Sequence, residues 1–169
     1  MLFCHIPCHI QRGCAALPEV ASQPGLWRRF RRLSRDDQRV VLTALMLLPI
    51  IMVARRTLPW SRLSSLLQPR NTRRLVDANR GWRIAALVSG VIRHTPAAIN
   101  CLDRSLLLLF TLRLADVEGE LRIGVRRSGS RLQAHAWVEH AGHVLNDSPA
   151  VHTNYAPLEG PPLRTACWT

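Results

Sequence analysis

Apolar residues in the first two thirds of the chain fall into runs of helical length. Fifteen consecutive residues, Val40 to Ala54, are largely apolar despite Pro49, and residues 75–93 repeat apolar positions at helical spacing. A third run, 106–110, follows an N-cap signal at Asn100. The first run is shorter than the roughly twenty residues that span a bilayer, so the pattern predicts a buried helix there. Together these runs predict a helical part over 25–114.

The pattern then changes to the alternation that is typical of strands. Leu121, Ile123 and Val125 alternate with polar positions, and after a turn at 127–130 a second strand runs from about residue 132 to residue 139. If residues 140–142 form a three-residue loop, Gly142 takes its left-handed position. His135 would then face Asp147 on one side of the sheet. A two-residue loop would put these two residues on opposite faces.

These elements predict an α+β fold, in which a helical N-terminal half packs on an antiparallel β-sheet over 118–148. The chain of 169 residues is long enough for one compact domain, expected over 25–169 after a disordered or loose tail at 1–24. Prolines after residue 148 indicate an irregular C-terminal wrap or a partly disordered tail.

Three residues of this framework have the chemistry of a cysteine enzyme. Cys101 would be the first residue of a helix, where unpaired amide groups and the helix dipole favour a thiolate. His135 follows thirty-four residues later and could act as its base, and Asp147 could orient the imidazole. The alternative for Cys101 is an inert core cysteine. Trp137 is expected as a wall of the cleft that contacts substrate, or as a core residue.

Four short motifs, taken in order, carry a resemblance to a known family. They are Cys-Leu-Asp-Arg-Ser-Leu at 101–106, Ile-Gly-Val-Arg at 123–126, Ala-His-Ala-Trp-Val-Glu at 134–139 and Leu-Asn-Asp at 145–147. Over roughly 38–158 the chain resembles the stand-alone leader peptidases of lasso-peptide biosynthesis, a transglutaminase-like branch of the papain-like cysteine enzymes. The resemblance implies leader removal from a ribosomally made precursor, with Cys101, His135 and Asp147 as nucleophile, base and orienting group.

The same resemblance implies partners. A separate cyclase would close the macrolactam, and a separate small protein would recognise the leader, because no leader-binding strand pattern precedes Cys101. No cofactor is expected for the peptidase, although the complex could depend on ATP. Two alternatives stay open: a transglutaminase-like acyltransferase that uses the same residues, and a non-catalytic arginine-rich scaffold.

The charge of the chain restricts its partners only weakly. The net charge is +12, and all basic residues are arginine, clustered at 28–32, 55–56 and 73–74. Such clusters attract acidic partners, but no nucleic-acid-binding motif accompanies them, so nucleic-acid binding is not expected. An apolar helix flanked by arginines also allows weak association with a membrane surface.

The N-terminal residues contain five candidate metal ligands and no signal peptide. No second ligand pair follows at a familiar zinc spacing, so no metal site is expected; the five are Cys4, His5, Cys8, His9 and Cys14. The stretch lacks the basic start and apolar run of a secretory signal, which favours the cytoplasm. An odd count of five cysteines fits a reducing compartment.

Overall fold

The computed structural model describes residues 25–59, 61–62 and 78–158. The predicted tail at 1–24 and its candidate metal ligands therefore lie outside the described residues. The chain divides into two compact units, 1–33 and 34–169. In the first unit, helix α1 (Leu26–Arg31) stacks Trp27 on Phe30, with ring centroids 5.7 Å apart.

Helix α2 (Arg35–Thr57) begins at a capped terminus and continues through Pro49. The Ser34 hydroxyl accepts a hydrogen bond from the Asp37 N–H (3.1 Å), which satisfies one of the free amides at the helix start. Asp37 also forms an ion pair with Arg83 of helix α4 (Ala78–Arg93), at 2.8 Å. The helix buries one side, comprising Ala44, Leu48 and Ile51.

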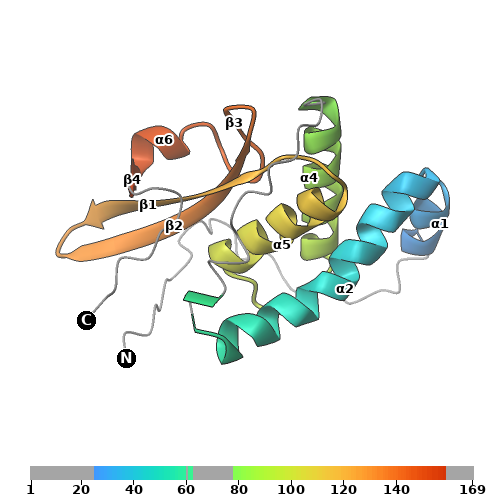
Figure 1. Ribbon diagram of the computed structural model, residues 1–169, viewed down its shortest axis with the longest axis horizontal. Coiled ribbons are helices and arrows are strands. Elements are labelled where there is room, and N and C mark those ends of the chain that lie inside the picture. Colours follow the sequence, from blue (N-terminus) through green and yellow to red (C-terminus); the bar gives the residue numbers. More distant parts are fainter. Residues whose placement is uncertain (1–24, 60, 63–77, 159–169) are drawn as a thin grey trace, which may run out of the picture. The chain divides into compact units, whose positions relative to one another are not determined.

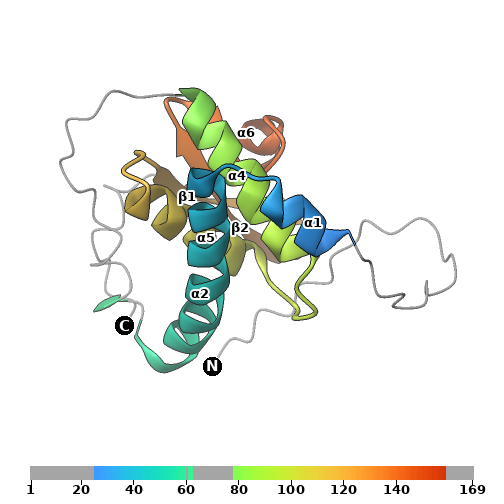
Figure 2. The ribbon, with the colours of Figure 1, turned by 90° about the vertical axis from the view of Figure 1, so that its right-hand side faces the viewer.

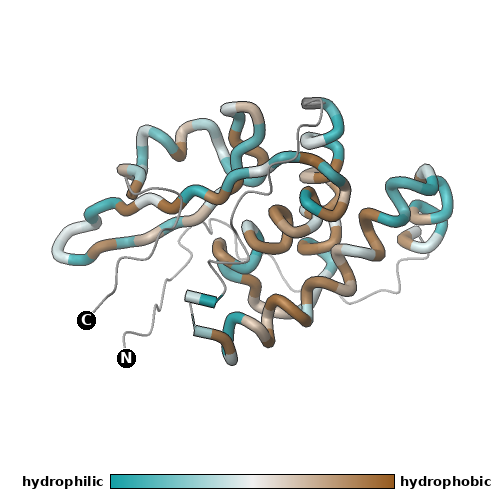
Figure 3. Tube along the Cα trace, viewed as in Figure 1, coloured by the Kyte–Doolittle hydropathy of each residue, from teal (hydrophilic) through white to brown (hydrophobic). Residues whose placement is uncertain are grey.

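The opposite side of α2 is apolar and exposed. Five side chains on this α2 outer face are 49–69 % exposed: Leu42, Leu45, Met46, Ile50 and Val53. The prediction of a buried helix is therefore wrong for these five positions. Figure 3 shows how strongly hydrophobic residues predominate along α2. Among the described residues, α2 is also the one helix long and apolar enough to cross a membrane, although core helices meet the same criterion.

Helices α4 (Ala78–Arg93) and α5 (Cys101–Leu114) complete the helical layer. Each contacts the other and α2, and α5 also packs on the sheet, so α5 lies between α2 and the strands (Figures 1 and 2). Four consecutive leucines of α5, residues 106–109, are at most 1 % exposed. This burial follows from contact with the sheet on one side and helices on the other.

The sheet is antiparallel, with strand order β3-β2-β1-β4. Its strands are β1 (Glu120–Ser128), β2 (Arg131–His140), β3 (His143–Val144) and β4 (Ala156–Pro157). The predicted α+β class with an antiparallel sheet is confirmed. The C-terminal segment is more regular than expected. Beyond residue 148 it forms helix α6 (Val151–Asn154) and strand β4, which pairs with β1.

The turn between β2 and β3 differs from the prediction. His140 pairs with His143, which leaves Ala141 and Gly142 as a two-residue turn with φ of +49° and +77°. Positive φ at both positions is typical of a type I′ turn, whose twist matches that of the adjoining strands. The prediction of a three-residue loop is wrong.

Candidate active site

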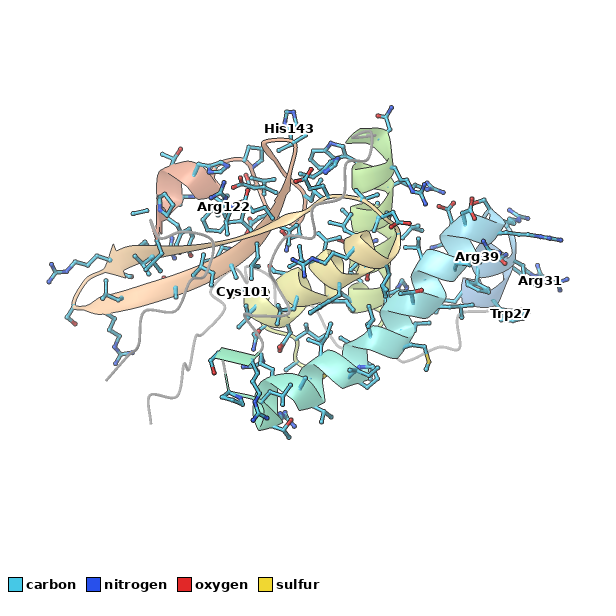
Figure 4. All side chains as sticks on the ribbon, in the orientation of Figure 1. Trp27, Arg31, Arg39, Cys101, Arg122 and His143 are labelled. Atoms are coloured by element: carbon cyan, nitrogen blue, oxygen red, sulfur yellow. The ribbon has the colours of Figure 1, made fainter. Side chains whose placement is uncertain are left out.

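Cys101 is the first residue of α5, as predicted (Figure 4). Asn100 caps the helix by accepting a hydrogen bond from the Asp103 N–H (2.9 Å). The Asp103 carboxylate does not complete a capping box. It is buried (2 % exposed) and forms an ion pair with Arg55 of α2, whose Nε lies 2.5 Å from Oδ1.

Cys101 docks on an edge of β2 that β3 leaves uncovered. The Leu145 N–H donates to the Val138 carbonyl (2.9 Å), so even-numbered residues of β2 direct their backbone groups toward this edge. One step beyond the end of β3, the Ala136 amide is close enough to the Cys101 sulfur to help lower the pKa of this thiol. The Ser105 hydroxyl donates to the Ala136 carbonyl (2.9 Å). Residues one turn apart on α5 thus replace a neighbouring strand.

Asn146 ends the β2–β3 ladder and joins it to α5. Its Oδ1 accepts from the Val138 N–H (2.8 Å), and its Nδ2 donates to the Ser105 hydroxyl (3.0 Å). Sequence reasoning assigned no role to Ser105 or Asn146. The available signal was their place inside the motifs that contain Cys101 and Asp147, but partners 31 and 41 residues apart cannot be recognised from local sequence.

His135 and Asp147 meet despite the two-residue turn. His135 Nε2 is hydrogen-bonded to Asp147 Oδ2. A two-residue turn was expected to put the two residues on opposite faces of the sheet. This expectation does not hold because β3 ends at Val144, and the chain bends from Leu145 to Asp147, so Asp147 does not follow strand alternation. Since Nε2 is turned to Asp147, Nδ1 is the ring nitrogen left for Cys101.

The surroundings favour a thiolate and imidazolium pair. Burial alone would raise the pKa of Cys101, but hydrogen bonds with His135 and with the Ala136 and Leu102 amides hold it below its usual range. The pKa of His135 is raised, first by Cys101 and further by Asp147, against the opposing effect of burial. Cys101 is half-buried, so a substrate can reach it.

Trp137 lies behind the histidine. Its side chain is 1 % exposed, and its Nε1 donates to the Glu139 carboxylate (2.7 Å). The rings of Trp137 and Tyr155 both stack with His135, at centroid distances of 6.2 and 5.0 Å. Trp137 thus supports the imidazole from a buried cluster that it forms with Val144 and Val151, which agrees with the expected core position.

A pocket adjoins the same region of α5. It has a volume of about 440 Å³ and lies between α4 and α5, with Arg104 and Asn146 among its lining residues. Its lining combines apolar side chains, among them Val88 and Ile92, with Arg93 and Arg104, which contribute positive charge. Such a lining suits a side chain that combines an apolar stem with an acidic end.

Two further histidines, at the ends of the β2–β3 turn, differ in their surroundings. His140 is 3 % exposed, and its Nδ1 is hydrogen-bonded to the Glu118 carbonyl (2.6 Å). His143 is exposed at the start of β3. Within 25–59, 61–62 and 78–158, no three His, Cys, Asp or Glu side chains are grouped as a metal site would require.

A family model described as the transglutaminase-like superfamily matches residues 44–160. The chain belongs to the transglutaminase-like superfamily. This match covers α2 from Ala44 onward and all of the residues described above as the candidate site. No curated protein and no solved structure matches the chain. Membership of this superfamily indicates cysteine peptidase or acyltransferase chemistry.

Proposed function

We propose that this protein is a cysteine peptidase that removes the leader from a lasso-peptide precursor. The main support is the convergence of Cys101, His135 and Asp147, with the Cys101 pKa lowered and the His135 pKa raised. The order of motifs that resembles lasso leader peptidases supports the substrate assignment.

The proposed reaction has two steps. The Cys101 thiolate attacks the leader–core carbonyl, and the imidazolium of His135 protonates the departing amine, which becomes the core N-terminus. Neutral His135 then takes a proton from water, which hydrolyses the thioester and releases the leader. Asp147 holds the ring in orientation throughout. The Cys101 N–H, one of the unpaired amides at the start of α5, would bind the oxyanion.

Cleavage of a precursor peptide tests this function directly. Mass spectrometry should detect separate leader and core after incubation with the protein, and no products with Cys101→Ala. His135→Ala should be as damaging, while Asp147→Asn should be equally severe or milder. Retention of more than about a tenth of the wild-type rate by Cys101→Ala would exclude a nucleophilic role.

Acyl transfer to an amine is the alternative within the family. The same thioester would form, but an amine would replace water, so the product mass distinguishes the two reactions. A non-catalytic scaffold predicts instead that Cys101→Ala keeps full biological function.

We also propose a set of partners in the cytoplasm. A separate small protein would hold the leader, and a separate cyclase would act on the released core; neither nucleic acid nor a cofactor of the peptidase is included. ATP dependence would belong to the complex.

Weak association with an anionic membrane surface is proposed for the α2 outer face, which has Arg39 and Arg56 near its ends. Sedimentation with phosphatidylglycerol vesicles should decrease for Met46→Glu. Equal sedimentation of the variant and the wild type would contradict this assignment.

A further inference from the structure

The β2 edge that receives Cys101 continues beyond the active site. Even-numbered residues direct their backbone groups to this edge, so after Ala136 the next such residues are Ala134 and Leu132. Each outward position lies about 7 Å from the next. Ala134 is exposed, and Leu132 is 77 % exposed.

Nothing within the described part of the chain covers this continuation. β3 pairs with the opposite end of β2, at Glu139 and His140. α5 begins at Cys101, and the preceding segment lines the pocket next to α4 through Thr95, Ala97 and Ile99. No partner is found there for the outward N–H and C=O groups of Ala134 and Leu132.

The free edge leads directly to the nucleophile. The Ala136 carbonyl is bound by Ser105, one turn after Cys101 on α5, so the neighbouring outward groups of Ala134 are the next hydrogen-bonding positions along the same edge. A chain paired there would pass beside Cys101 in the extended conformation that exposes a peptide carbonyl to attack. We propose that the substrate peptide binds by adding as a strand to the β2 edge at Leu132 to Ala134.

This inference rests on the proposed peptidase function and deepens it. Strand addition recognises peptide backbone, so it would accept many side chains at the paired positions and favour an unfolded segment over a folded domain. A leader–core junction held open in a precursor meets that requirement. The α4–α5 pocket could then select among extended peptides through one side chain.

Reactive peptides of defined sequence provide a test that does not need the natural precursor. Tetrapeptide chloromethyl ketones and chloroacetyl tetrapeptides extend the chain in opposite directions from the electrophile, and the Cys101 thiolate displaces chloride from each. One series should modify Cys101 at least about tenfold faster than chloroacetone or chloroacetamide, as two or more added hydrogen bonds imply.

N-methylation of the probe amides, one at a time, then shows which of them pair with the β2 edge. Methylation of alternate amides should remove the acceleration by about tenfold, while the amides between them should tolerate it, because a strand directs alternate amides to its neighbour. Uniform effects, or no acceleration in either series, would overturn the proposal. This measurement uses the wild-type protein, so it does not depend on how a variant folds.

Ala134→Pro tests the protein side. Proline removes an outward N–H and places its ring on the edge, a position where strands tolerate proline. The peptide acceleration should be lost. Arg127→Pro is the matched control, because Arg127 directs its N–H to the opposite edge of the same hairpin, and it should keep the acceleration.

Two further outcomes separate this proposal from its competitors. Pairing between two copies of the chain would give a dimer in sedimentation that Ala134→Pro dissociates, with probe acceleration falling as protein concentration rises; that result would overturn substrate binding at this edge. If N-methylation slows the probes at alternate amides but no precursor is cleaved, the result would support strand addition and contradict the leader-peptidase function.

Discussion

Cys101 combines a helix terminus with contacts from a strand, and neither alone accounts for its lowered pKa. Burial acts against the thiolate, so the charge depends on His135 and on the Ala136 and Leu102 amides. The α5 dipole adds to these contacts. Because the decisive groups are 34 and 35 residues away, the helix start predicts the location of the nucleophile and the fold provides the rest of its activation.

The pH dependence of alkylation follows from the two pKa shifts. Iodoacetamide should modify Cys101 with a midpoint below the ordinary thiol value of about 8.5. In His135→Ala the midpoint should rise toward that value, because the variant lacks the side chain that does most to offset the effect of burial on the Cys101 pKa. Peptide mapping by mass spectrometry separates Cys101 from the other cysteines. A wild-type midpoint at or above about 8.5 would contradict the thiolate.

The pH range of peptide cleavage should have an alkaline limit as well as an acid limit. Activity requires the Cys101 thiolate together with protonated His135, so kcat/KM should fall below the thiol pKa and above the imidazole pKa. Since the His135 pKa is raised, the alkaline limb should lie above the ordinary value of about 6.5. An alkaline limb below about 6.5 would contradict the ion pair.

Ser105 and Asn146 should couple stability to reactivity. Ser105→Ala leaves the Ala136 carbonyl and the Asn146 Nδ2 without their partner, which should lower the free energy of unfolding by about 1–3 kcal/mol. Urea titration measures this loss. In the double variant, the loss of unfolding free energy should be smaller than the sum of the losses caused by Ser105→Ala and Asn146→Ala separately, because both substitutions interrupt one hydrogen-bond network.

Alkylation separates positioning from general destabilisation. At low temperature, where Ser105→Ala remains folded, its Cys101 alkylation midpoint should rise toward that of His135→Ala. An unchanged midpoint would restrict Ser105 to a structural role.

At the level of elements, the β2–β3 turn is a site for stabilisation. Ala141 has a φ of +49°, which an alanine adopts at a cost of about 1–2 kcal/mol, whereas asparagine before glycine suits this turn. Ala141→Asn should raise the free energy of unfolding by about 0.5–1 kcal/mol, measured by urea titration. Gly142→Ala should lower it, because Gly142 also has positive φ. A lowered free energy of unfolding for Ala141→Asn would contradict the two-residue turn.

The elements differ in how far their sequences predict them. The α5 start and the β1–β2 hairpin have strong local signals, namely the Asn100 cap and the alternation of Leu121, Ile123 and Val125. The register of β3 was missed because Gly142 fits both loop lengths. The exposed side of α2 was missed since its apolar residues surround the helix, which leaves no polar stripe to mark the solvent side.

On the scale of the whole chain, charge should affect the encounter with an acidic partner. With a net charge of +12, the kcat/KM for an acidic precursor should fall as salt rises from low to physiological concentration. Alkylation by neutral iodoacetamide should change little over the same range and serves as the control. Equal salt dependence of the two rates would exclude electrostatic steering.

Partner dependence is the second prediction at this scale. The purified protein should process a precursor slowly, and the separate leader-recognition protein should accelerate it strongly by raising the local concentration of the scissile bond. Mass-spectrometric rates with and without the partner measure the effect. Equal rates would show that the chain recognises its substrate alone.

The attachment of Cys101 and Ser105 to Ala136 also makes the cysteine a reporter of local unfolding. Activation requires α5, β2 and the bend at Asp147 to be assembled together, and these segments are up to 46 residues apart in sequence. An opening that separates the hairpin from α5 would return Cys101 to an ordinary thiol before the rest of the molecule unfolds. Partly folded forms of the protein would therefore lose the reactivity of Cys101 before they unfold completely.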